Sequence, residues 1–221
     1  MRVNRSFGYL LGMDNLTNPS IDNDALSEII QEGLPPEFDD PNYSFTSDKT
    51  PFGLDDLHLD DRFQGLFQEI TASILQYFSN MAFQKAEYYI SKAWATYTKQ
   101  KQFIATHKHV ASHYSFVYYV QTDEEIHSPI TFYEPAQGLR VPESKIWNAD
   151  NYRSLKIKPK TGLFIMFPSH VEHGTEEMAE TDVARISISG DIVITAEGGH
   201  KTEYLLPSPS TWRKLNGPVT H

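Results

Sequence analysis

The sequence predicts a mainly β fold of the jelly-roll type, with helices preceding the strands. Short apolar and aromatic stretches, separated by Pro and Gly, recur from residue 86 onward, which is typical of a β-sandwich or barrel. A stripe of apolar side chains at helical spacing precedes them over residues 63–81. The length of 221 residues suits one sizeable core. We therefore expect a single domain over residues 1–221, with a jelly-roll core at 86–195 and a C-terminal tail at 196–221.

The first 85 residues are expected to contain an edge strand, two helices and an acidic loop. Residues 2–12 fit the strand, and Asp22 or Asp24 is placed to cap a first helix that Gly33 ends. The second helix covers residues 60–80, and its apolar stripe comprises Phe63, Leu66, Phe67, Ile70, Ile74, Tyr77, Phe78 and Met81. An apolar stripe of this kind predicts that the helices buttress one face of the sheet.

The loop at 35–61 is rich in Pro, Asp, Asn and Ser and carries the acidic pairs Asp39-Asp40 and Asp55-Asp56. Such a charge run is typical of a solvated face, whereas a loop this long inside a compact domain also fits a lid or substrate-binding segment. Both interpretations are open at this point.

Seven strands are expected after residue 86, because β-branched and aromatic residues cluster between turn residues there. They are Tyr88–Tyr97, Phe103–Thr106, Tyr114–Gln121, Ile130–Tyr133, Leu155–Ile157, Gly162–Phe167 and Ala184–Ile194.

Composition excludes several classes of function. The formal net charge is −10 and no basic stripe is visible, which argues against nucleic-acid binding by charge. The absence of cysteine excludes disulfides and thiolate metal sites. No apolar run approaches membrane-spanning length, and residues 1–5 lack a signal core. These features predict a cytoplasmic protein without a membrane partner.

Three histidines on β-rich segments are candidate ligands of one metal ion. His107 and His109 are two residues apart, so on an extended backbone they project to the same side. His173, from a distant segment, would complete one face of an octahedron and leave positions for substrates. Neutral imidazole is the commonest protein ligand for first-row transition metals.

Arg185 and Ser187 also share one face of a predicted strand, twelve residues beyond His173. A guanidinium and a hydroxyl in this arrangement suit a carboxylate ligand. An inward Arg is costly unless it meets an anion, so the alternatives are that Arg185 faces solvent or pairs with a protein carboxylate such as Glu172.

These motifs together resemble the iron(II)/2-oxoglutarate-dependent oxygenase superfamily, especially its prolyl-hydroxylase-like branch and uncharacterised bacterial and phage relatives. The shared features are a His-x-ligand pair, a Tyr-Tyr strand at 117–120, a Gly-Leu-Phe-Ile-Met-Phe-Pro-Ser strand at 162–169 followed by His173, and Arg-x-Ser on the next strand. The resemblance covers roughly residues 87–192. The sequence departs from the pattern at His109, which replaces the usual carboxylate ligand.

The resemblance implies a double-stranded β-helix (jelly roll, cupin-like) and a dioxygenase, most simply a hydroxylase. It would couple decarboxylation of 2-oxoglutarate to succinate with oxidation of a C–H bond in a small-molecule or peptidyl substrate, using O2. His107, His109 and His173 would hold Fe(II), and no other catalytic residue is implied. Arg185, Ser187, Tyr119 and Tyr97 would hold 2-oxoglutarate, although both tyrosines also fit as plain core aromatics.

Other assignments were weighed against this one. His113 and His170 are rival ligands, expected beside the site or on the surface, while His58, His127, His200 and His221 are expected in solvent. A cupin-like three-histidine metal dioxygenase without 2-oxoglutarate keeps the fold and the metal, and a non-catalytic jelly-roll binding module keeps only the fold. The oligomeric state is open, with a homodimer among the alternatives.

Overall fold

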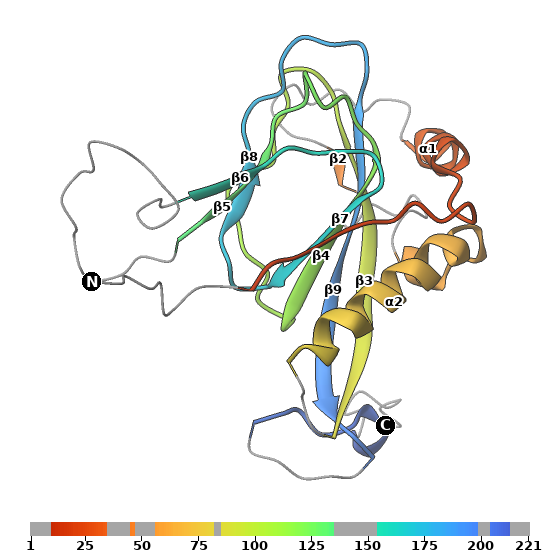
Figure 1. Cartoon of the computed structure of the whole chain (residues 1–221), viewed down its shortest axis with the longest axis vertical. Helices are drawn as coiled ribbons and strands as arrows, with labels where there is room; N and C mark the ends of the chain where they lie inside the picture. The colour runs from red at the N-terminus through yellow and green to blue at the C-terminus, as the bar shows by residue number, and fades with distance from the viewer. Residues whose placement is uncertain are drawn as a thin grey trace, which may run out of the picture.

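The computed structural model describes residues 10–34, 45–46, 56–81, 85–134, 154–198 and 204–212. Within these residues the chain forms two antiparallel sheets that face each other (Figure 1). The large sheet has the order β1 (Gly12–Asn15), β7 (Leu163–Pro168), β4 (Tyr114–Gln121), β9 (Arg185–Ala196), β3 (Ala86–Thr98) and β2 (Phe45–Thr46). The small sheet has the order β6 (Ser154–Ile157), β5 (Ile130–Tyr133) and β8 (His173–Thr175). The predicted jelly roll is confirmed.

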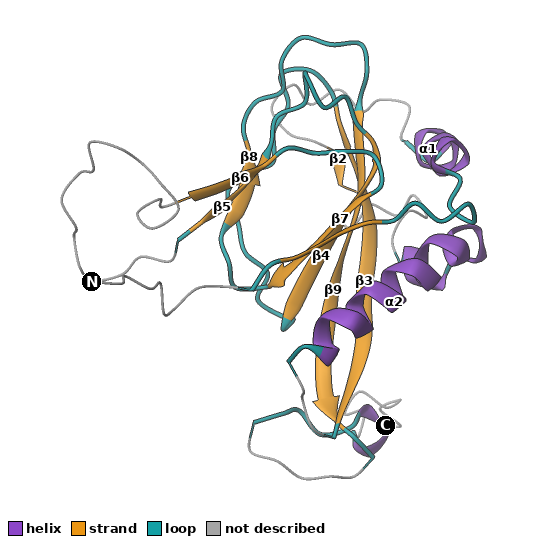
Figure 2. Cartoon of the chain, in the orientation of Figure 1, coloured by secondary structure: helices purple, strands orange, loops and turns teal. Residues whose placement is uncertain are grey.

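Two helices cover the face of the large sheet that points away from the small sheet (Figure 2). They are α1 (Asn23–Glu32) and α2 (Gln64–Ser79), with short 3-10 turns η2 (Leu57–Leu59) and η3 (Asp61–Phe63) before α2. Asp22 is the cap of α1, because its side chain accepts a hydrogen bond from the amide of Ala25 at 3.1 Å. Gly33 follows the last turn, as predicted.

The apolar stripe of α2 is buried against this sheet and stabilises it. Its buried members are Leu66, Phe67, Ile70, Ile74 and Phe78. Full burial of such a side chain contributes about 1.5–3 kcal/mol, counted against an extended chain. The helices therefore fix the outer face of the sheet and leave its inner face for a cavity.

Strand β9 shows most clearly how alternation divides the two faces. Ile186 and Ile188 are fully buried and belong to the core beneath the helices. Arg185, Ser187 and Ser189 alternate with them and line the space between the two sheets. One strand thus contributes apolar groups to the core and polar groups to the interior cavity.

The structure corrects several sequence expectations. Residues 103–106 do not form a strand; this irregular segment reaches β8 through hydrogen bonds between Ile104 and Thr175, each 2.9 Å. The edge strand lies at Gly12–Asn15, and residues 2–9 of the predicted strand lie outside the described residues. Most of the 35–61 loop, including the lid interpretation, also lies outside them.

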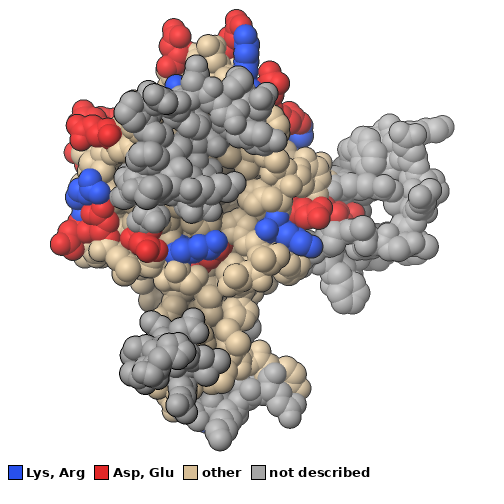
Figure 3. Space-filling model, turned by 180° about the vertical axis from the view of Figure 1, so that it is seen from behind, with Lys and Arg blue, Asp and Glu red and all other residues tan. Residues whose placement is uncertain are grey.

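The described surface carries charges of both signs. On the face shown in Figure 3, Lys and Arg side chains (blue) stand among Asp and Glu side chains (red). In the described parts of the chain, no helix combines the length and apolarity needed to cross a bilayer.

Candidate metal centre and anion pocket

Backbone pairing brings the three predicted histidines together. His173 is the first residue of β8, and His107 exchanges two hydrogen bonds of 2.9 Å with its backbone. The amide of His109 donates to the carbonyl of Ser169 at 2.9 Å. As a result, one ring nitrogen from each histidine lies within 4.8 Å of those from the other two.

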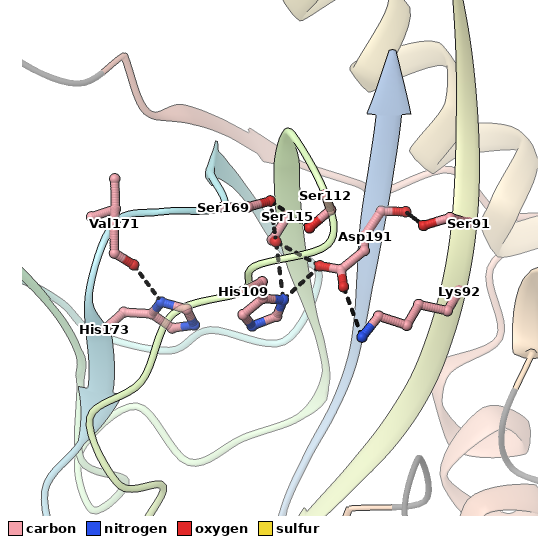
Figure 4. Close-up of polar contacts among 9 residues, drawn as sticks. All are labelled: Ser91, Lys92, His109, Ser112, Ser115, Ser169, Val171, His173 and Asp191. Carbon is pink, nitrogen blue, oxygen red and sulfur yellow. Dashed lines mark hydrogen bonds and ion pairs between the residues drawn. The ribbon is translucent and has the colours of Figure 1, made fainter. Parts of the chain in front are cut away.

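The hydrogen bonds of the Nδ1 atoms orient all three rings. Nδ1 of His107 lies 2.8 Å from the carbonyl oxygen of Ala105, and Nδ1 of His173 lies 2.9 Å from that of Val171. Nδ1 of His109 lies 2.5 Å from Oδ1 of Asp191 (Figure 4). Because each partner is an acceptor, the proton of the neutral ring belongs on Nδ1 and the lone pair on Nε2. The Nε2 atoms are therefore the ones that could bind a metal ion.

The electrostatics of the cluster favour a neutral His173 ring. Burial, with smaller contributions from the neighbouring His107 and His109, lowers the pKa of His173 to about 3, against the opposing effects of the Val171 carbonyl and the charge of Asp191. Since metal binding requires the deprotonated ring, a buried His173 loses little to proton competition near neutral pH.

A cavity of about 490 Å³ joins the histidines to Arg185 and Ser187, the predicted carboxylate-binding pair, which we call the anion anchor. The three histidines, Arg185, Ser187 and Tyr119 all line it. His107 is exposed whereas Arg185 is 3% exposed. The cavity therefore opens on the side of His107, and the guanidinium lies at its closed side.

Among the described residues, the hydrogen-bond acceptors of Arg185 are uncharged oxygen atoms. Its Nη1 donates to the carbonyl of Ser128 at 3.0 Å, and its Nη2 approaches Oγ1 of Thr98 at 3.4 Å and of Thr175 at 3.3 Å. Burial lowers the pKa of Arg185, and the side chain of Tyr119 opposes this effect. In the described part of the chain it forms no ion pair with a carboxylate, and Glu172 is exposed. The interior arrangement, rather than the solvent-facing or Glu172-paired alternative, is the observed one.

The two predicted tyrosines have different positions. Tyr119 is 2% exposed and lines the cavity, and burial raises its pKa to about 12 against the lowering effect of Arg185. Tyr97 corrects the prediction: it packs against the core beneath the helices and does not line the cavity. Thr96 lines the cavity, and because side chains alternate along β3, the adjacent Tyr97 points to the opposite face.

The remaining described histidines lie outside the cluster. His113 accepts a hydrogen bond from the amide of Ile194 on its Nδ1 at 3.1 Å, and His170 is exposed. His127 was expected in solvent but is 3% exposed, with its Nε2 2.9 Å from the carbonyl oxygen of Val183. His58 is half-buried. The predicted rivals, His113 and His170, are therefore not brought to the three-histidine cluster.

Asp191 is the site residue that sequence reasoning missed. It continues the inward alternation of Arg185, Ser187 and Ser189 along β9, which is the signal that could have found it. Its carboxylate contacts the cluster through His109. Three convergent nitrogen donors beside an open cavity fit a transition-metal ion such as iron, with imidazole in place of the carboxylate of a two-histidine, one-carboxylate site.

A comparison with protein families gives one match, and it includes the residues of the candidate site. Residues 92–191 match the family described as "Putative 2OG-Fe(II) oxygenase". The matched segment contains the three histidines, Arg185, Ser187 and Asp191. No curated protein matches the chain.

Solved structures of low sequence identity share the fold. The chain is similar to AviO1 from Streptomyces viridochromogenes Tue57, with 12% identity over 86% of this chain and 92% of that one and a TM-score of 0.53. It is also similar to SnoK, a non-haem alpha-ketoglutarate-dependent carbocyclase from nogalamycin biosynthesis, with 12% identity, coverage of 86% and 82%, and a TM-score of 0.55. HygX from Streptomyces hygroscopicus, solved with nickel and 2-oxoglutarate bound, gives 9% identity, coverage of 82% and 81%, and a TM-score of 0.50.

Proposed function

We propose that the chain is an iron(II)/2-oxoglutarate-dependent oxygenase, and specifically a hydroxylase of a small-molecule or peptidyl substrate; the match of residues 92–191 to that family and the three-histidine cluster support this. Enzymes of this superfamily use Fe(II) and 2-oxoglutarate. When bound, these two supply the oxidation, in which 2-oxoglutarate is decarboxylated to succinate as a substrate C–H bond is oxidised by O2. The protein's own residues bind, orient and shield the reactants.

In this proposal the Nε2 atoms of His107, His109 and His173 hold the iron. Their Nδ1 hydrogen bonds keep the rings in the required tautomer before the metal arrives. The low pKa of the buried His173 keeps that ring in its neutral form.

The burial of Arg185 is the observation that supports 2-oxoglutarate as the cosubstrate. Arg185 is a buried cation at the closed end of a cavity whose other end carries the histidines, and its described partners are uncharged. A buried charge of this kind is costly unless an anion meets it. Thr175, which Arg185 contacts, lies two residues beyond His173 on β8, roughly 7 Å along the strand. A short dicarboxylate can therefore span from the histidine cluster to the guanidinium, with Ser187 and Tyr119 beside it.

The substrate would enter at the open side of the cavity. Lys92, Trp94, Lys108 and Val110 line this part, and Val110 is 87% exposed. The indole of Trp94 offers an apolar surface next to His109, with ring centroids 5.7 Å apart. Assignment to the prolyl-hydroxylase-like branch, a cytoplasmic location, and the absence of nucleic-acid partners stay predictions from the sequence.

A second candidate is a three-histidine metal dioxygenase that uses no 2-oxoglutarate, which the replacement of the carboxylate ligand favours. Thermal unfolding with Ni²⁺, with 2-oxoglutarate, and with both separates the two. A ligand that binds only the folded protein raises its melting temperature. We expect 2-oxoglutarate to raise it further only when Ni²⁺ is present. No additional rise with 2-oxoglutarate would favour the second candidate.

A further inference from the structure

A buried carboxylate stands directly behind one of the three candidate ligands. Asp191 is 1% exposed, and its Oδ1 lies 2.5 Å from Nδ1 of His109 and accepts a hydrogen bond from Oγ of Ser115 at 2.6 Å. Its Oδ2 pairs with Nζ of Lys92 at 3.0 Å (Figure 4). The strand register produces this convergence, because Asp191 is opposite Lys92 on β3 and opposite Ser115 on β4.

Both oxygens of the buried carboxylate face hydrogen-bond donors or a cation. Oδ1 faces Nδ1 of His109 and Oγ of Ser115, and Oδ2 faces the ammonium group of Lys92. The three-histidine set contributes no negative charge of its own. Asp191 thus places one negative charge next to the cluster, on the far side of the His109 ring from Nε2.

We propose that Asp191 is a positioning residue of the metal centre, which fixes the orientation and tautomer of His109 and makes its Nε2 a stronger donor. In this arrangement no carboxylate binds the metal directly, and the carboxylate of Asp191 acts on it through the imidazole of His109. The inference rests on the metal site of the proposed function and adds a residue to it. A carboxylate that accepts from the second nitrogen of a ligand histidine raises the basicity of that ligand.

The contact with His109 can be separated from the ion pair with Lys92. Lys92 uses the other carboxylate oxygen, its side chain is 46% exposed, and its Nζ lies 4.9 Å from the centroid of the Trp94 ring. On the His109 side, the Oγ atoms of Ser115 and Ser169 are 2.8 Å apart. Oδ1 of Asp191 is therefore held by His109 and Ser115, and Ser115 in turn by Ser169, independently of Lys92.

The test is calorimetric titration of Ni²⁺ into the metal-free full-length protein. Asp191→Asn should weaken Ni²⁺ binding by about 10- to 100-fold, the usual effect of losing such a partner. Glu180→Gln, which removes an exposed carboxylate that pairs with Lys101, should bind Ni²⁺ as the parent does. Lys92→Met should lower thermal stability and leave most of the metal affinity, because the Asp191–His109 contact remains.

A double-mutant cycle shows whether Asp191 acts through His109. In a His109→Ala background, adding Asp191→Asn should change the remaining Ni²⁺ affinity by no more than about twofold, the margin for independent sites. A purely structural role would lower the affinity equally in both backgrounds, which would overturn the inference.

A measurement on the parent protein avoids any variant that fails to fold. Nitrogen-15 NMR of the metal-free, histidine-labelled protein should show the proton of His109 on Nδ1. A proton on Nε2 would overturn the inference, as would equal Ni²⁺ affinity of Asp191→Asn and the parent. In the latter case the parent still binds metal and the proposed function stands, whereas a parent that binds no Ni²⁺ refutes both.

Discussion

Arg185 donates a hydrogen bond to Oγ1 of Thr175 at 3.3 Å, and this contact links the anion anchor on β9 to the strand that carries His173. His173 and Thr175 lie two residues apart, so their side chains project to the same side of β8. Strand β8 and the hydrogen bond between Arg185 and Thr175 therefore fix the distance between the three-histidine cluster and the guanidinium. This relationship supports a ligand with two separated anionic ends.

The metal site should depend on His173 and not on its neighbour His170. His173→Ala removes a donor from the cluster and should abolish stoichiometric binding of Ni²⁺ or Fe(II) while leaving cooperative unfolding. His170→Ala, which changes an exposed side chain, is the matched control and should retain the metal. The measurement is the metal content of the parent and both variants after reconstitution and desalting. Equal content in His173→Ala and the parent would contradict the assignment of His173.

Gly174 should be required for the approach of the His107 segment to β8. A Cβ atom at this position would lie 2.9 Å from the carbonyl oxygen of Ile104 and 3.0 Å from backbone atoms of Thr106. Gly174→Ala should therefore push this segment away from His173 and weaken Ni²⁺ binding in a calorimetric titration. Gly198→Ala is a control for backbone strain away from the site, because Gly198 has a φ of +33° but an added Cβ meets no atom within 4 Å there. Unchanged metal affinity in Gly174→Ala would show that the backbone pairing does not set the site.

Replacing His109 with the carboxylate that iron(II)/2-oxoglutarate-dependent oxygenases usually carry should destabilise the metal-free protein. His109→Asp removes a donor from the buried Asp191 and places a second anion near it, which should cost about 1–3 kcal/mol of unfolding free energy. Adding Asp191→Asn should restore part of that loss, because the like charges no longer meet. Urea unfolding of the single and double variants measures both effects. Equal destabilisation in the two variants would argue against an interaction between positions 109 and 191.

His127 should make the stability of the protein depend on pH. Burial, opposed by the Val183 carbonyl and aided by the charge of Arg185, lowers its pKa below the ordinary value of 6.5. The unfolded state therefore binds a proton that the folded state does not, so this contribution is fully present above pH 6.5 and is lost as the pH falls below it. Protonation would also place a hydrogen on Nδ1, which accepts from the amide of Asp123 at 3.0 Å. The stability difference between the parent and His127→Gln, from urea unfolding, should shrink between pH 7 and pH 5; a constant difference would contradict this.

Alternation along the strands made part of the site predictable. It placed Arg185 and Ser187 on one face, the two-residue spacing of His107 and His109 predicted that they share a side, and the apolar stripe of α2 predicted which face the helices cover. The assignment of Tyr97 failed because an aromatic side chain suits either face of a sheet, and the register of β3 shifts between Ile90 and Lys92. Alternation counted from the start of that strand is therefore not kept to its end.

Other features depend on contacts between segments that are distant in sequence. Strand β8 has three residues, too few for a recognisable pattern, and it exists because it pairs with β5. The role of Asp191 requires the pairing of β9 with both β3 and β4, which brings Lys92 and Ser115 to it. The burial of His127 likewise follows from a contact with Val183, 56 residues away.

The central claim is that the cavity binds 2-oxoglutarate between the metal and Arg185. Calorimetric titration of 2-oxoglutarate into the Ni²⁺-loaded protein under anaerobic conditions tests it most directly. Losing one partner of a buried, hydrogen-bonded charge pair costs about 2–5 kcal/mol. At about 1.4 kcal/mol per tenfold change in affinity, Arg185→Leu should weaken 2-oxoglutarate binding by roughly 30- to several thousand-fold. Arg185→Lys should lie between, because it keeps the charge and loses the fork.

Arg62→Leu is the matched control, since Arg62 is exposed and pairs with Asp60 away from the cavity. The account predicts that the parent and Arg62→Leu bind 2-oxoglutarate alike, that Arg185→Leu binds it far more weakly, and that all three bind Ni²⁺ equally. No binding of 2-oxoglutarate to the metal-loaded parent, or equal binding to Arg185→Leu and the parent, would contradict it.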